Sequence, residues 1–257
     1  MNETHHRIGL IVPSSNTTIE TEMPEMLARR ARATGERFTF HSSRALLHSV
    51  DEESLARMVG ELDRCANELI DARTDVILYA CLVALMVQGA GAHEKAERRI
   101  GEILTSRGHN AVVSSSAGAL VRAVEALGIE RVAIITPYVE ALTAAVADYL
   151  EAAGVTVVRR LSLVVQDNVE VGKLDQEQLL EYALDLDLAD AEALIISACV
   201  QMPSLDVIAK AEDSLGLPVL SAATAGVFDV LSRLGLDPAV PNAGSLLAGG
   251  AVRVETT

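Results

Sequence analysis

The chain has 257 residues, half of them hydrophobic, and carries 36 acidic against 21 basic residues, for a formal net charge of −15. Such a chain is globular and long enough to bury a sizeable core. The charge argues against nucleic-acid binding, which needs a basic face, and so does an aromatic content of only 3%. An acidic protein still binds small anions through backbone N–H groups, because net charge does not describe a single site.

No apolar run approaches the roughly 20 residues that cross a bilayer. Met1 to Arg7 lead directly into a predicted strand and contain no signal-peptide hydrophobic region. We therefore expect a cytoplasmic protein with no membrane partner. The three cysteines include no CxxC pair and are predicted to be reduced thiols. No metal site is expected, because His93 and His109 lack the spacing to cysteine of a structural zinc site.

Strands and helices alternate through the first half of the chain. Predicted strands cover residues 7–12, 38–44, 75–81 and 111–113. Predicted helices run to about residue 32, over 51–71, after Cys81, and over 120–127 up to Gly128. Glu20 and Glu22 fall in the first turn of the first helix, where acidic side chains are favoured. This alternation predicts a parallel sheet with right-handed crossovers and helices on both faces.

The second half repeats this order. Residues 131–135 correspond to the first strand, 155–160 to the second, and Cys199 to Cys81. Residues 218–235 align with 111–128 without a gap, so that Ser221 matches Ser114. The predicted fold is therefore α/β, with two pseudo-symmetric doubly wound parallel-sheet domains and the active site between them. Approximate boundaries assign residues 1–118 plus 219–257 to the first domain and 119–218 to the second, with the C-terminal helix crossing over.

Two cysteines occupy matching positions, each after an apolar strand and at the predicted start of a helix. At the carboxyl edge of a parallel sheet, open α/β folds bind their ligands, and a helix N-terminus favours a thiolate. A single buried cysteine is more often a small core side chain. The duplicated context favours a function for both Cys81 and Cys199. Cys65 has no such counterpart and is predicted to be structural, on a helix face.

Three polar segments, residues 13–16, 114–118 and 221–224, end strands at the same edge of the predicted sheets. Their hydroxyl and amide groups either form an anion-binding rim or simply cap helices. No GxGxxG follows the first strand, and neither GxxxxGK[ST] nor GxSxG occurs. Nucleotide binding and serine-hydrolase chemistry are therefore unsupported.

Several motifs together point to one family. They are Gly9–Glu22 with its PSSN loop, Phe40–Arg44, Ala80–Ala84, Ser115–Ala119 and Thr136–Tyr138. In these motifs the chain closely resembles the maleate cis-trans isomerases of the aspartate/glutamate racemase superfamily, from about Arg7 to Gly235. The resemblance implies a cofactor-independent enzyme that acts on a small dicarboxylate, with no metal or redox cofactor. Members of this superfamily are usually dimers, so a homodimer or higher homo-oligomer is expected.

The resemblance also implies roles for individual residues. Cys81 is expected to be the nucleophile and Cys199 the partner thiol on the opposite wall. The residues expected to bind the substrate are Ser14, Asn16, Val83, Ala84, Tyr138, Asn168 and Val200. In such an enzyme a thiolate adds to C2 of maleate, the C2–C3 bond rotates, and elimination yields fumarate. This chemistry requires Cys81 to be a thiolate at neutral pH, which a helix N-terminus and nearby donors are expected to favour.

Other functions remain open at this point. An amino-acid or hydantoin racemase would use the two thiols on opposite faces of a carbon. An arylmalonate-type decarboxylase is expected to have only one of the two thiols, so Cys199 argues against it. Outside enzymes, the alternatives are a dicarboxylate-binding protein and a redox sensor that pairs Cys81 with Cys199.

Overall fold

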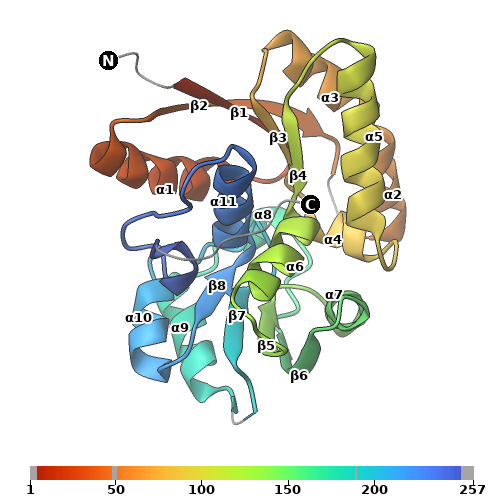
Figure 1. Cartoon of the computed structure of the whole chain (residues 1–257). Coiled ribbons are helices and arrows are strands. Elements are labelled where there is room, and N and C mark those ends of the chain that lie inside the picture. The colour runs from red at the N-terminus through yellow and green to blue at the C-terminus, as the bar shows by residue number, and fades with distance from the viewer. Residues whose placement is uncertain (1–4, 48–50, 189, 250–257) are drawn as a thin grey trace.

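The computed structural model describes residues 5–47, 51–188 and 190–249. Within them the strands form two four-stranded parallel sheets, ordered β2-β1-β3-β4 and β6-β5-β7-β8 (Figure 1). The first sheet contains β1 (His5–Pro13), β2 (Arg37–Ala45), β3 (Val76–Tyr79) and β4 (Val112–Ser115). The second contains β5 (Arg131–Thr136), β6 (Thr156–Ser162), β7 (Ala193–Ser197) and β8 (Val219–Ser221). The identical strand order confirms the α/β class and the internal duplication.

Helices flank both sheets. Those of the first half are α1 (Ile19–Thr34), α2 (Glu52–Gly60), α3 (Leu62–Asp71), α4 (Leu82–Met86), α5 (Ala92–Ser106) and α6 (Ser116–Ala126). Those of the second half are α7 (Glu140–Ala152), α8 (Asn168–Val171), α9 (Gln176–Asp185), α10 (Ile208–Leu215) and α11 (Ala222–Arg233), followed by the 3-10 turn η1 (Ser245–Leu247). In Figure 1, α3 and α5 pack on one side of the first sheet and α1 and α11 on the other. None of the described helices is long and apolar enough to cross a membrane.

The central strands explain why the thiol positions are enclosed. Every residue of β3 and of β7 is buried. A strand in the middle of a parallel sheet is covered by helices on both faces, so it reads as a continuous apolar run rather than an alternating one. Cys81 and Cys199, each two positions beyond the end of its strand, therefore lie in the protein interior.

The helix predicted over residues 51–71 is wrong in one respect: it is two helices. Glu61 is both the C-cap of α2 and the N-cap of α3, with φ −87° and ψ −1°. Gly60 precedes this break, and glycine weakens a helix interior because it loses more backbone entropy than other residues. The apolar spacing on either side was therefore a correct helix signal interrupted by one residue.

Residues 114–118 lie between the predicted strand 111–113 and the predicted helix 120–127, but they do not form the loop that this position implies. Ser114 and Ser115 end β4, and the following residues form the first turn of α6. The Ser115 hydroxyl accepts the N–H of Gly118 and caps this helix, whereas α11 is capped by Ser221. The caps are thus displaced by one residue from the gap-free alignment. At their C-terminal ends the two helices do match, since Gly128 and Gly235 both adopt positive φ, 65° and 72°.

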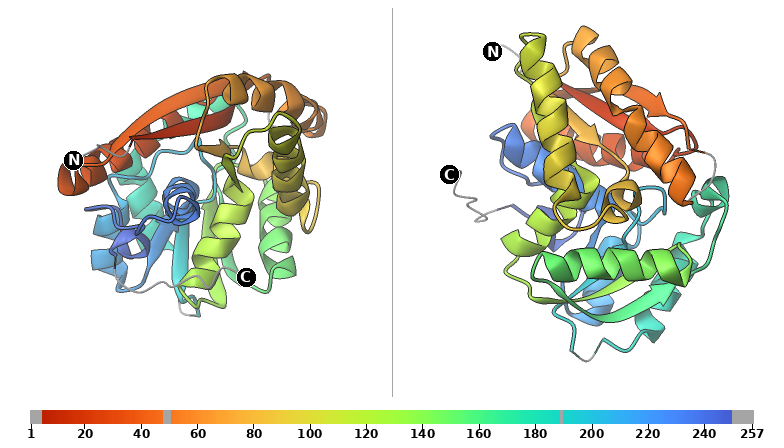
Figure 2. Two further views of the ribbon diagram at one scale, coloured as in Figure 1. Left: turned by 45° about the horizontal axis from the view of Figure 1, so that its top comes forward. Right: turned by 90° about the vertical axis from the view of Figure 1, so that its right-hand side faces the viewer.

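Helices α6 and α11 pack against each other between the two sheets (Figures 1 and 2). Strand β8 pairs with β7 in the second sheet, whereas α11 packs against α1, β3 and β4 of the first half. The chain therefore crosses between the halves at the β8–α11 junction, a few residues after the predicted boundary at 218. The division into two domains stays a prediction, and we propose Ser221 as its C-terminal boundary.

Candidate active site

Cys81 directly follows the β3 region and is the N-cap of α4, with extended backbone at φ −142° and ψ 95°. Its side chain is buried. Burial raises the pKa of the Cys81 thiol to about 12, and the backbone N–H of Ala84 opposes this rise. The expectation of a thiolate at neutral pH is therefore wrong for this enclosed arrangement. One N–H donor at a helix of five residues does not compensate for the loss of water around a charged sulfur.

Cys199 follows β7, but the helix predicted to start there is absent. Residues 198–207 form turns and bends, and α10 begins only at Ile208. Pro203 lacks an N–H and disfavours helical backbone at the residue before it. The Ser197 hydroxyl instead organises the segment by donating to the carbonyls of Cys199 and Met202, each at 2.9 Å. We call residues 200–207 the Cys199 loop.

Tyr138 brings the two thiols into one group. It is buried, and its hydroxyl is hydrogen-bonded to Cys199. Burial raises the pKa of Cys199, whereas Tyr138 and the N–H groups of Gln201 and Met202 lower it. A negative charge on Cys199 also raises the pKa of Cys81. The two cysteines, which are 118 positions apart in the chain, are therefore close enough for a charge on Cys199 to affect Cys81.

Within the described part of the chain, the side-chain amide of Asn16 in the PSSN loop has a hydrogen-bonded oxygen and an unpaired nitrogen. Its Oδ1 accepts the N–H groups of Thr18 and Ile19 at 3.1 Å each and so caps the start of α1. Its Nδ2 is buried and has no hydrogen-bond partner among the residues that the structure describes. A buried N–H donor without a partner is costly and calls for an explanation. Asn16 therefore presents a donor suited to an incoming carboxylate oxygen.

The other predicted polar residues of the site are connected across the two halves. Asn168 begins α8, and its Nδ2 donates to the Ser15 hydroxyl of the PSSN loop at 2.8 Å. Ser14 lies in the same loop, but its hydroxyl accepts the N–H of Leu47 at 3.0 Å and donates to the Leu47 carbonyl at 3.4 Å. The hydroxyl proton of Ser14 is thus used to hold the end of β2.

The predicted apolar site residues flank the thiols. Val83 and Ala84 are in α4 and Val200 follows Cys199, and all three are at most 4% exposed. The other two polar segments of the predicted rim serve inside the fold. Ser221 and Thr224 form a reciprocal capping box at the start of α11, and the Ser114 hydroxyl donates to Asp229. For these segments the helix-cap and packing interpretation holds.

Gln201 was not found by sequence reasoning, yet it connects the most parts of the site. Its N–H contacts the Cys199 sulfur at 3.4 Å. Its Oε1 accepts from Thr17 and Thr18, while its Nε2 donates to the carbonyls of Ser15 and Asn168. The only signal in the sequence was its position two residues after Cys199.

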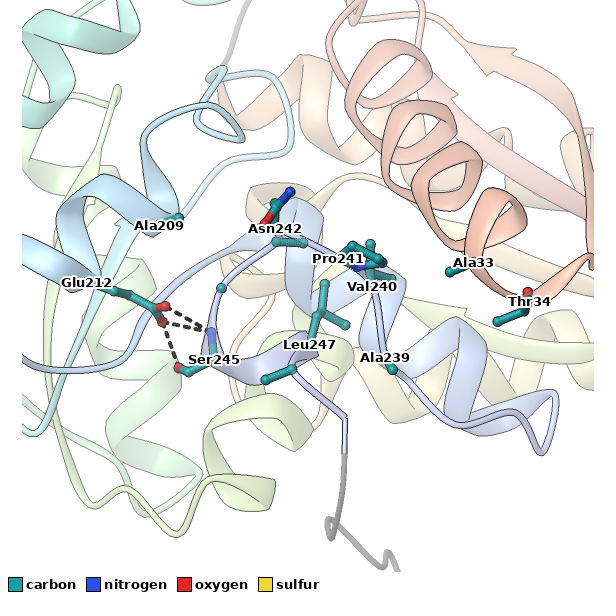
Figure 3. Close-up of a pocket in the computed structure, with 13 residues that line it drawn as sticks. Ala33, Thr34, Ala209, Glu212, Ala239, Val240, Pro241, Asn242, Ser245 and Leu247 are labelled. Atoms are coloured by element: carbon teal, nitrogen blue, oxygen red, sulfur yellow. Dashed lines mark hydrogen bonds between the residues drawn. The ribbon is translucent and has the colours of Figure 1, made fainter.

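Two cavities in the described part of the chain lie elsewhere. One of about 450 Å³ lies between α1, α10 and residues 239–248 (Figure 3). Its carboxylate, Glu212, is already bonded to the N–H and hydroxyl of Ser245. The other, of about 340 Å³, is lined by residues of α5, α6 and α7. Neither is lined by a cysteine or by any predicted site residue.

Comparison with known proteins agrees with this architecture. A family model described as arylmalonate decarboxylase matches residues 8–247. The chain is 52% identical to the maleate isomerase of Geobacillus stearothermophilus over 246 residues, which are 95% of this chain and 98% of that protein.

Solved structures give the same result. A cysteine-to-alanine variant of the maleate isomerase from Pseudomonas putida S16, with maleate, has a TM-score of 0.96 at 43% identity, covering 97% of this chain and 100% of that one. A cysteine-to-serine variant of the Nocardia farcinica maleate cis-trans isomerase, with a covalently bound succinylcysteine intermediate, has a TM-score of 0.92 at 50% identity, covering 95% and 98%. The chain therefore belongs to the arylmalonate decarboxylase family and, within it, to the maleate isomerases.

Proposed function

We propose that this protein isomerises maleate to fumarate without a cofactor, with Cys81 as the nucleophile and Cys199 as its partner. The observation that carries the proposal is the pair of buried thiols, one from each half, that follow β3 and β7 and both lie near the Tyr138 hydroxyl. The related N. farcinica variant with its succinylcysteine intermediate supports a covalent route through cysteine. The P. putida S16 variant with maleate supports a small dicarboxylate substrate.

The chemistry follows from the need to remove the C2–C3 double bond before rotation. The Cys81 thiolate forms a bond to C2, and the π electron pair moves to C3 and the carboxylate attached there. The Cys199 S–H bond breaks and its proton goes to C3, which gives a succinyl-cysteine adduct. After rotation about C2–C3, the Cys199 thiolate takes a proton back from C3. The C–S electron pair returns to Cys81 as fumarate leaves, so protons and charge balance over the cycle.

The pKa values indicate how the nucleophile is formed. Cys199 receives a hydrogen bond from Tyr138 and two from backbone N–H groups, whereas Cys81 receives one from Ala84. These contacts favour a thiolate at Cys199, and we propose that Cys81 becomes the nucleophile by passing its own proton to Cys199. A negative charge on Cys199 raises the pKa of Cys81, so we propose that the pair carries a single negative charge during the reaction.

Donors for the substrate carboxylates come from both halves. The open Nδ2 of Asn16, the Tyr138 hydroxyl and the Asn168 amide are proposed to bind them. Charge that develops on a carboxylate during addition is stabilised most by such preorganised donors in a site without water. Cys81, Cys199, Asn16, Tyr138 and Asn168 are each at most 5% exposed. Substrate entry therefore requires the closed arrangement to open.

The test is proton NMR of the reduced protein with maleate in D2O, with aspartate, glutamate and an arylmalonate in parallel samples. We expect fumarate from the parent protein and none from Cys81→Ser, with unchanged circular dichroism. Cys199→Ala should lower the rate strongly. An active Cys81→Ser variant would refute the assignment of the nucleophile. Deuterium entering the Cα of an amino acid, without fumarate formation, would instead support a racemase that uses both thiols as bases.

We also propose that the protein is a cytoplasmic homodimer or higher homo-oligomer, as the sequence resemblance implies. Sedimentation velocity of the reduced protein measures the assembly state directly. A species with the mass of a single 27.2 kDa chain at all concentrations would exclude the homo-oligomer.

A further inference from the structure

The Cys199 loop has no helix of its own, so its shape depends on contacts made by other segments. Near its start, the side-chain Oε1 of Gln201 accepts the N–H of Thr17 at 2.9 Å and that of Thr18 at 3.2 Å. Both donors precede α1, in the other half of the protein. Residues of the first half therefore hold the start of the Cys199 loop in place.

Further along the loop, the contact is made by a buried carboxylate. Glu22 in α1 is 7% exposed, and its Oε1 accepts the N–H of Ser204 at 2.6 Å and that of Leu205 at 2.7 Å. The pKa of Glu22 is raised, because the effect of burial outweighs that of the two N–H groups, which lower it. Hydrogen bonds to a charged acceptor are roughly twice as strong as neutral ones. Glu22 is therefore a strong anchor between α1 and the loop.

The two thiols differ in this respect. Cys81 is followed immediately by α4, whose residues are all apolar and buried, and α4 packs against α7 of the second half. The segment after Cys199 has no such helix, and the N–H groups of Gln201 and Met202 that contact its sulfur lie between the two anchors. Loss of the Glu22 anchor would release Ser204 and Leu205 and leave these donors held by the Gln201 side chain and the Ser197 hydroxyl.

We propose that Glu22 is a positioning residue for Cys199, which it serves by fixing Ser204 and Leu205 across the boundary between the halves. The proposal rests on the function proposed above and adds a residue to it. Glu22 touches neither thiol and acts through the loop. Its loss should slow the proton transfers between Cys199 and C3 while leaving the Cys81 sulfur in place.

The first test separates kcat from KM. Glu22→Ala should lower kcat for maleate on the order of tenfold, as expected for the loss of charge-assisted hydrogen bonds, and change KM by less than about threefold. Glu22→Gln should recover most of kcat, because its amide oxygen still accepts both N–H groups. The matched control is Glu25→Ala, on the same helix, whose carboxylate is partly exposed and pairs with Arg29. It should behave like the parent protein.

The second test measures each thiol alone and needs no substrate. Cys65→Ala with Cys81→Ser leaves only Cys199, and Cys65→Ala with Cys199→Ser leaves only Cys81. Adding Glu22→Ala should speed iodoacetamide alkylation of Cys199 by about fivefold or more, because a loosened loop opens more often. Alkylation of Cys81 should change by less than about twofold.

The outcomes distinguish the two proposals. Equal acceleration of both thiols, or parent-like kcat and alkylation rates in Glu22→Ala, would overturn the positioning role. A parent protein without activity on maleate would refute the proposed function alone, since the alkylation comparison does not use substrate. If Glu22→Ala fails to fold, Glu22→Asp keeps the charge but shortens its reach. Glu22→Asp should then speed the alkylation of Cys199 but not that of Cys81. Unchanged alkylation of Cys199 in this variant would refute the positioning role.

Discussion

Replacing Asp229 tests the buried charge network that joins α5, α6 and α11. Asp229 is 3% exposed, and its two oxygens accept hydrogen bonds from Ser114 at 2.5 Å, from Arg122 at 2.7 and 2.8 Å, and from Arg233 at 2.8 Å. Both arginines also pair with Glu97 of α5. The network thus ties together the two helices that pack between the sheets.

The size of the effect follows from what Asp229→Asn leaves behind. The amide keeps the shape but removes the charge, so two arginines remain opposite one carboxylate, and the amide N–H2 faces a donor. Breaking a buried ion pair by changing one partner costs about 3–5 kcal/mol. The arginine side chains are 26% and 31% exposed, which favours the lower end. We expect a loss of about 3 kcal/mol, or a fall in Tm of about 6–12 °C at about 2–4 °C per kcal/mol.

Urea unfolding at neutral pH, followed by circular dichroism, measures this loss. The matched control is Asp213→Asn in α10, where the carboxylate is exposed.

Burial raises the pKa of Asp229, but the hydrogen bonds and charges of Arg122 and Arg233 outweigh this and hold the pKa below its usual value. Its contribution is therefore present above the unfolded pKa of about 3.9 and is lost as the pH falls through the lower folded value. A loss below about 1 kcal/mol at neutral pH would show that solvent screens the network, against this reasoning.

Three further predictions concern the site. Asn16→Asp keeps the acceptor for Thr18 and Ile19 but replaces the open Nδ2 donor with an oxygen. In steady-state assays kcat/KM for maleate should fall by about 100-fold or more, while the helix cap is preserved. A smaller fall would show that Asn16 does not bind the substrate. Cys65→Ala should change kcat by less than about twofold and cost about 1 kcal/mol in urea unfolding; a large loss of activity would mean that the wrong cysteine was excluded. Burial is the largest cause of the raised pKa of Cys81 and remains when Cys81 is the only thiol. Alkylation of that variant should therefore keep speeding up with pH beyond about pH 8.5, the usual pKa of a thiol. A plateau near about pH 8.5 would indicate an ordinary thiol.

The amino-acid sequence by itself determined the two sheets and the place of the thiols. Apolar runs and helix signals act over a few residues, so the alternation of strands and helices and the duplication could be predicted without knowing any distant contact. The matching positions of Cys81 and Cys199, each after a fully buried strand, followed from the same local patterns.

Only the tertiary structure decided which polar groups face the thiols and which serve the fold. Ser114 and Asn16 look alike as residues that follow strands, yet one donates to Asp229 and the other has an open donor. The protonation of Cys81 depends on how completely the fold excludes water, which no short pattern records. Glu22 was expected only to stabilise its own helix, but it bonds to residues 182 and 183 positions away. Such contacts depend on how the two halves pack, and no spacing of residues in the sequence indicates that packing.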